Sequence, residues 1–154
     1  MLFRSEYVAP ECGVRETVTI CGNATVTVRD YQSGRLWDDA ICYSFYPIDL
    51  HVSSGSGLDM EMLAEGVVPT IPRGAMIPEG SQHFIVAGRC ISSDRLANSA
   101  LRVQATSMAT GQGAGALAAL AANQQCTPGD VPLADLRAVL KAHGAIVPPA
   151  VDPH

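Results

Sequence analysis

The sequence predicts an α/β fold, α+β by content, because of one short apolar run and the segment that follows it. Residues 84–87, Phe-Ile-Val-Ala, are apolar and stop at Gly88, which is typical of an interior strand in a parallel sheet. A polar loop then leads into residues 108–122, which are mostly Ala and Gly and predict a long helix. Ligands of parallel sheets bind beyond the carboxyl ends of the strands, so Gly88, Arg89 and the start of this helix form a candidate ligand site.

The predicted helix contains glycines that need a packing or binding reason, since each costs roughly 1 kcal/mol relative to Ala. Gly111 and Gly115 are four residues apart and share a face, so another backbone or a flat ligand can approach closely there. Composition alone favours a helix buried in an α/β core. A membrane span is disfavoured, because the apolar run is shorter than the ~20 residues required and contains Gln112.

The first half of the chain predicts short strands and loops. Residues 17–20 and 24–28 alternate as strands should, and a Cys-Gly-Asn turn separates them. From residue 36 to residue 80 the chain is interrupted by prolines and by the run Ser-Ser-Gly-Ser-Gly at 53–57. So much irregular chain is unusual for an independent core and suits a segment that completes another domain.

The carboxyl-terminal end predicts one surface helix and a frayed tail. Asp130 and the following Val-Pro form a good helix start, leucines and a valine then recur at helical spacing, and Gly144 is a stop signal. Residues 147–154 are rich in proline and are expected to fray.

Charge and cysteine usage exclude several classes of protein. The net charge of −5 and the scattered basic residues leave no basic stripe, so nucleic acid is not an expected partner. The five cysteines lack C-x-x-C spacing and the four histidines lack H-x-x-x-H spacing, so no metal site is expected. An odd cysteine count without a signal peptide indicates reduced thiols and a cytoplasmic location.

Several short motifs occur in an order that is specific when they are taken together. They are Gly13-Val14-Arg15-Glu16-Thr17, Tyr46-Pro47-Ile48-Asp49-Leu50-His51, Ile71-Pro72 through Ile77-Pro78, Gly88-Arg89-Cys90-Ile91-Ser92, Arg102-Val103, and Met-Ala-Thr-Gly-Gln-Gly-Ala-Gly at 108–115. These motifs resemble those of the FAD-dependent oxidoreductases. More narrowly, they resemble the FAD_oxidored group of the glutathione-reductase-like flavoprotein superfamily, over most of residues 13–145.

The resemblance implies the C-terminal part of a Rossmann-like FAD-binding domain together with short strands of a substrate domain. Residues 1–80 would supply substrate-domain strands and loops, and residues 81–146 the last strand and the helices of the FAD-binding domain. In this family the helix after the last strand points its positive amino end at the isoalloxazine ring of FAD. The residues that the motifs assign to the cofactor are Gly88, Arg89, Ser92, Arg102, Val103, Gln104, Ala105, Thr106 and Gly111.

The loop that holds a dinucleotide pyrophosphate, G-x-G-x-x-G after a strand, is missing from the sequence. Residues 111–115 imitate it but are predicted to lie inside a helix. The resemblance therefore implies a separate N-terminal FAD-binding portion, in cis or as another chain, that completes an enzyme for hydride transfer from a small-molecule substrate. The alternative is a flavin-free, stand-alone structural or interaction module derived from the same fold.

Acid–base chemistry is assigned by the same resemblance. Hydride transfer usually needs a proton donor or acceptor, and His51, Asp49 and Tyr46 lie in a substrate-domain motif, as does Arg15 in another. Asp49 capping a turn and Tyr46 packing in the core are the alternative interpretations. Arg95 stands where the family has a loop histidine, which leaves the direction of the reaction and the substrate class open.

Overall fold

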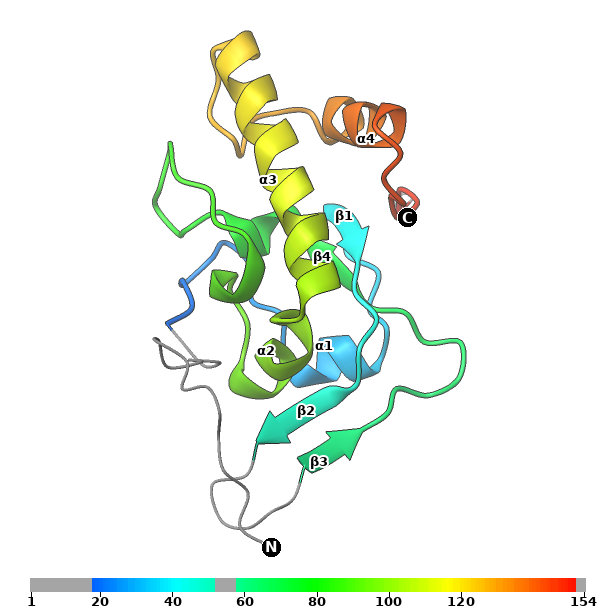
Figure 1. Ribbon diagram of the computed structural model, residues 1–154. Helices are drawn as coiled ribbons and strands as arrows, with labels where there is room; N and C mark the ends of the chain where they lie inside the picture. Colours follow the sequence, from blue (N-terminus) through cyan, green and yellow to red (C-terminus); the bar gives the residue numbers. More distant parts are fainter. Residues whose placement is uncertain (1–17, 52–57, 152–154) are drawn as a thin grey trace, which may run out of the picture.

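A computed structural model describes residues 18–51 and 58–151 (Figure 1). One long helix, α3, runs through the described structure, and the other elements are arranged around it. The described elements are α1 (Val28–Gln32), β1 (Ala40–Tyr43), β2 (Ile48–His51), β3 (Leu58–Glu61), β4 (Thr70–Pro72), the 3-10 turns η1 (Arg73–Met76) and η2 (Gly88–Cys90), α2 (Arg95–Leu101), α3 (Gln104–Gln124) and α4 (Leu133–Ala142).

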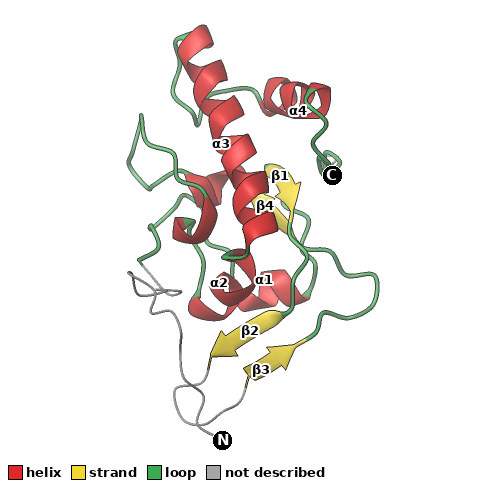
Figure 2. Cartoon of the chain, viewed as in Figure 1, coloured by secondary structure: helices red, strands yellow, loops and turns green. Residues whose placement is uncertain are grey.

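The strands form two small antiparallel ribbons (Figure 2). β1 pairs with β4, and β2 pairs with β3 in a register that sets Asp49 opposite Met60. The described residues are 40% helical and 12% strand, which confirms the α+β content. They contain no parallel sheet, only one isolated parallel bridge between Val26 and Ser93. Short strands and loops in the first half are confirmed.

The strand predicted at residues 84–87 is wrong for the described structure. The segment is extended, but within residues 18–51 and 58–151 its one backbone hydrogen bond runs from Val86 N–H to Met76 O, at 2.8 Å. Phe84 is 70% exposed. An apolar run becomes an interior strand only where neighbouring strands pair with both of its edges, and residues 18–51 and 58–151 supply no such neighbours.

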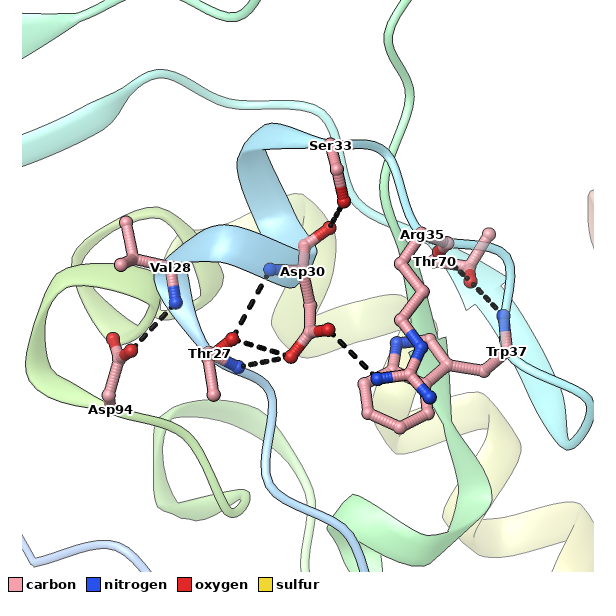
Figure 3. Close-up of polar contacts among 8 residues, drawn as sticks. All are labelled: Thr27, Val28, Asp30, Ser33, Arg35, Trp37, Thr70 and Asp94. Carbon is pink, nitrogen blue, oxygen red and sulfur yellow. Dashed lines mark hydrogen bonds and ion pairs between the residues drawn. The ribbon is translucent and has the colours of Figure 1, made fainter.

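The strands predicted at residues 17–20 and 24–28 are also absent, and residue 17 lies outside the described residues. Val18 is 85% exposed, and the second segment ends in helix α1. The reason is a capping box: Thr27 Oγ1 accepts from Asp30 N–H, and the Asp30 carboxylate accepts from Thr27 N–H (Figure 3). These local hydrogen bonds outweigh the strand propensity of the Thr-Val alternation.

Helix α2 lies where the sequence predicts a polar loop. Asp94 is its N-cap, and the Asp94 carboxylate accepts from Ala97 N–H at 2.8 Å. The same carboxylate accepts from Val28 N–H at 2.7 Å, so one side chain joins the starts of α1 and α2 (Figure 3). The Asp at this position is an ordinary N-cap signal.

The long helix of small residues is confirmed as α3, but only one of its faces is buried. The buried residues recur at intervals of three or four and are Thr106, Thr110, Gly113, Leu117 and Ala121. A Cβ added at Gly113 would lie 2.7 Å from Ile41 Cδ1, whereas nothing described lies within 4 Å of a Cβ at Gly111 or Gly115. The close approach therefore occurs at Gly113, and the Gly111 face is exposed.

Helix α4 follows the prediction and closes the core beside α3 (Figure 1). Leu136 and Leu140 are buried, and Gly144 terminates the helix with φ +78°. The Arg137 guanidinium donates to Ala40 O at 3.0 and 3.2 Å, which ties α4 to β1. Pro148 is buried, so the tail is attached as far as that residue, whereas the sequence indicates fraying from residue 147.

Candidate functional site

The amino end of α3 is open and lacks a side-chain cap. Val103 is its N-cap and makes no cap hydrogen bond, and Gln104 and Ala105 are exposed. The first N–H groups of a helix have no partner within the helix, and together they carry about half a positive charge. Ser107 N–H returns to Val103 O at 2.9 Å, so the ordinary helical bonding begins there. The preceding N–H groups can therefore receive an acceptor from outside.

Arg102, two residues before the start of α3, carries a full positive charge. It is the C-cap of α2 and is half-buried between α2 and α3. Its Nη2 donates to the carbonyl oxygen of Asp49 at 3.2 Å. This contact brings together two residues that the sequence assigns to different functions, Arg102 to the cofactor and Asp49 to the substrate.

Strand β2 is fixed on α2 by a second contact. Asp49 N–H donates to Ser99 Oγ at 3.1 Å, and Ser99 Oγ donates to Leu96 O at 2.7 Å. The Asp49 backbone is thus bound on both sides, by Ser99 and by Arg102. Asp49 itself lies within the β2–β3 ribbon, opposite Met60.

Buried hydroxyl groups connect Tyr46 to the first turn of α3. Tyr31 Oη donates to Tyr46 O at 2.9 Å and accepts from Tyr46 N–H at 3.1 Å. Ser44 Oγ lies 3.3 Å from Tyr31 Oη and 2.9 Å from Thr106 Oγ1. Tyr31, Ser44 and Thr106 are at most 2% exposed, so the three hydroxyls depend on one another for hydrogen bonding.

Gly88 lies against the next turn of α3. Its N–H donates to Thr110 Oγ1 at 2.9 Å, and Thr110 Oγ1 donates to Thr106 O at 2.9 Å. Gly88 has φ +70°, a backbone conformation that favours glycine. The predicted adjacency of Gly88 to the start of the helix is therefore present, although no strand precedes it.

Other predicted cofactor residues lie apart from this cluster. Ser92 is buried, and its Oγ lies 2.9 Å from Thr25 Oγ1, so it faces the first segment of the chain. Arg89 is exposed in η2, and its carbonyl oxygen accepts from Asn98 Nδ2 at 3.1 Å. Gly111 is exposed about two turns into α3. The structure does not gather these three residues at the helix end.

The predicted catalytic residues are placed in part. The Tyr46 side chain is half-buried, and its peptide group is held by Tyr31. His51 ends strand β2 with its backbone opposite Leu58, but the side chain of His51 is outside the described part. Arg15 and the rest of its motif also lie outside the described residues.

Sequence reasoning missed four polar residues that position the site: Tyr31, Ser44, Ser99 and Thr110. Thr110 carried a signal, because it is a polar residue among Ala and Gly on what is now the buried face of α3. Tyr31 and Ser44 carried none, since their partners are distant in sequence. Burial raises the pKa of Tyr31, although its hydrogen bonds to Ser44 and Tyr46 oppose the shift, so this hydroxyl stays protonated at neutral pH.

Two hollows flank α3 away from its amino end. One of about 690 Å³ is lined by Ala118, Ala122 and His83, and one of about 530 Å³ by Met108, Gln112 and Tyr43, among others. Neither is lined by a predicted site residue.

Across residues 18–51 and 58–151, no group of three or more His, Cys, Asp or Glu side chains is placed to hold a metal ion. None of the helices in these ranges combines the length and the apolarity needed to cross a membrane.

An uncapped helix end and a guanidinium can both donate hydrogen bonds to an anionic group. The sequence model of the FAD dependent oxidoreductase family matches residues 3–140. This match covers most of the chain, and the chain belongs to the FAD-dependent oxidoreductase family. FAD is therefore its cofactor. No curated protein and no solved structure matches the chain.

The residues at the amino end of α3 fit FAD. Isoalloxazine carries carbonyl oxygens and a ring nitrogen that accept hydrogen bonds, and the open N–H groups of Gln104 and Ala105 are donors. The Arg102 guanidinium supplies further donors and positive charge.

Proposed function

We propose that this chain is the C-terminal segment of an FAD-dependent oxidoreductase of the glutathione-reductase-like superfamily, and that it forms the isoalloxazine and ribityl side of the flavin site for hydride transfer. The observation that carries the proposal is the position of Arg102, which lies at the uncapped start of α3 and contacts Asp49 O at 3.2 Å. One side of this junction would face the cofactor and the other the substrate.

Each proposed role follows from the chemistry of the group. Bound FAD supplies the hydride acceptor. Arg102 and the N–H groups of Gln104, Ala105 and Thr106 stabilise negative charge that develops beside them. Gly88 follows on the ribityl side, because its N–H is bound to Thr110 one turn further along α3. Asp49, Tyr46 and His51 are the proposed proton donors or acceptors, since β2 places their segment next to Arg102.

The remaining FAD contacts are proposed to come from an N-terminal FAD-binding portion, in cis or as a separate chain. The Gly111–Gly115 run lies inside α3 rather than after a strand, so it does not form a pyrophosphate loop. The exposed face of α3 around Gly111, Gly115 and Ala118 suits close packing against such a portion, which would complete a Rossmann-like domain. We also propose that the enzyme acts on a small-molecule substrate and is located in the cytoplasm.

Titration of FAD followed by fluorescence tests the proposal. The chain alone should bind FAD weakly, because pyrophosphate and adenosine contacts supply much of the affinity for a dinucleotide. The chain together with the N-terminal FAD-binding portion should bind FAD stoichiometrically and become yellow.

Tight, stoichiometric FAD binding by the isolated chain would contradict the need for the second portion. No FAD binding by the complete assembly would favour the flavin-free structural or interaction module.

A further inference from the structure

The buried hydroxyls of Tyr31, Ser44 and Thr106 join the substrate segment to the start of α3. We propose that they are positioning residues of the reaction: they fix the amino end of α3, and hence its N–H donors, relative to the Tyr46–Asp49 segment. This inference rests on the proposed flavin site at that helix end. It goes beyond that proposal because it concerns the side-chain hydroxyls of the three residues, which bond one another and the Tyr46 peptide group rather than the cofactor.

The hydroxyl hydrogens of Tyr31, Ser44 and Thr106 can all be assigned, and each hydroxyl donates in the direction from Thr106 toward Tyr46. Tyr31 Oη donates to Tyr46 O at 2.9 Å, so it can only accept from Ser44 Oγ at 3.3 Å. Ser44 Oγ must then accept from Thr106 Oγ1 at 2.9 Å. Each hydroxyl has one proton and uses it once. Loss of any member leaves a buried oxygen without its partner.

Thr106 transmits this constraint to the open helix end. It lies in the first turn of α3, whose N–H groups are the proposed donors, and its Oγ1 binds a residue 62 positions earlier. Thr110 holds the same turn from the other side, because its Oγ1 bonds both Thr106 O and Gly88 N–H. The helix start is therefore fixed between the Tyr46 peptide group and Gly88.

A shift of this turn has a predictable electrostatic consequence. The field of a helix end falls off within about the first turn, so small displacements change the stabilisation of nearby charge. Reduced flavin carries more negative charge on its pyrimidine side than oxidised flavin. Release of the helix start should therefore lower the flavin reduction potential.

The test compares threonine variants in the FAD-loaded enzyme that contains this chain. Thr106→Val removes the hydroxyl and keeps the shape, and Thr106→Ser keeps the hydroxyl. Thr70→Val is the control, since Thr70 is also 2% exposed and its hydroxyl is also hydrogen-bonded, donating to Arg35 O and accepting from Trp37 N–H. The readouts are the flavin reduction potential, the shape of the flavin absorption band and the unfolding temperature.

We expect Thr106→Val to lower the potential and alter the flavin band, and Thr106→Ser to restore both. Thr70→Val should lower the unfolding temperature at least as much, because its hydroxyl makes two hydrogen bonds, while leaving the potential and the band unchanged. Equal potentials in Thr106→Val and Thr70→Val, in an enzyme whose potential does respond to Arg102→Ala, would overturn the positioning role alone. If neither Arg102→Ala nor Thr106→Val changed the flavin reduction potential, both the flavin site and this inference would be overturned.

Discussion

The guanidinium of Arg102 donates to the carbonyl oxygen of Asp49 at 3.2 Å and joins the carboxyl end of α2 to strand β2. Neither the charge of Arg102 nor its donors are used up by this bond, because a guanidinium has five N–H groups. Asp49 O thus orients the cation, and the other donors can serve a ligand.

Arg102→Ala should lower the flavin reduction potential of the complete enzyme. The charge stabilises reduced flavin more than oxidised flavin, and charges near helix ends contribute about 1 kcal/mol. For a two-electron couple, 30 mV corresponds to about 1.4 kcal/mol, so a shift on the order of 20 mV is expected. Arg29→Ala, an exposed arginine of α1, is the control and should leave the potential unchanged. An unchanged potential in Arg102→Ala with full flavin content would make Arg102 a structural residue.

Gly113→Leu should destabilise the fold by about 1–3 kcal/mol, because it overpacks the core. A Cβ at Gly113 would already lie 2.7 Å from Ile41 Cδ1, and Ile41 is itself buried. Gly111→Leu in the same helix should be neutral or stabilise the chain by roughly 0.5–1 kcal/mol, since its space is open and Gly is a poor helix former. Urea unfolding of both variants measures the difference. Equal destabilisation would contradict the assignment of the packed face.

In the complete enzyme, Gly111→Leu tests whether the exposed face of α3 contacts the N-terminal FAD-binding portion. If the exposed face of α3 packs closely on the N-terminal FAD-binding portion, Leu at this position should lower the flavin content per protein. Asn123→Leu, at an exposed position near the carboxyl end of α3 and off the face that Gly111 shares with Gly115 and Ala118, is the comparison. Equal flavin retention by both variants would place the contact surface elsewhere.

Arg137→Met should cost about 1–3 kcal/mol of stability, because it leaves a buried carbonyl oxygen without its donors. Arg137 lies in α4, and its side chain donates to Ala40 O and, at 3.2 Å, to Asp38 O. Lys141→Met is the matched control, since Lys141 is exposed on the same helix. Chemical denaturation should separate the two variants, and similar midpoints would show that these hydrogen bonds contribute little.

Asp30 should make part of the stability depend on pH in the acid range. Burial alone would raise its pKa, but hydrogen bonds from Thr27 and the Arg35 guanidinium, 2.9 Å away, together lower it (Figure 3). A carboxyl whose pKa is lower in the folded state stabilises the fold above its unfolded value of about 3.9, and loses this contribution as the pH falls through the folded value. The wild type should therefore exceed Asp30→Asn in stability at neutral pH, with the difference shrinking below about pH 4.

Thermal unfolding across this pH range provides the measurement for Asp30. Asp38→Asn, which changes an exposed carboxylate, is the control and should track the wild type. A stability difference between wild type and Asp30→Asn that stays constant down to the lowest pH would contradict the role of the ionised carboxylate.

The sequence by itself determined the elements whose signals are local. Helix α3 follows from a long run of Ala and Gly with no internal proline, and α4 from its apolar spacing and Gly144. The short ribbons between residues 40 and 72 follow from the proline and glycine punctuation. The family and its FAD cofactor followed from ordered motifs, which lie between residues 13 and 115.

Only the tertiary structure decided which of these elements meet. Residues 84–87 read as a strand, but pairing depends on neighbours and not on the run itself. Gly111 and Gly113 are alike in sequence, and the position of Ile41 alone makes Gly113 the packed one. The contact of Ser44 with Thr106 spans 62 residues, and a hydroxyl in a sequence does not specify its partner. Such contacts form only when the whole core folds. The conformational entropy lost on closing a loop of this length must be offset by the burial of other residues.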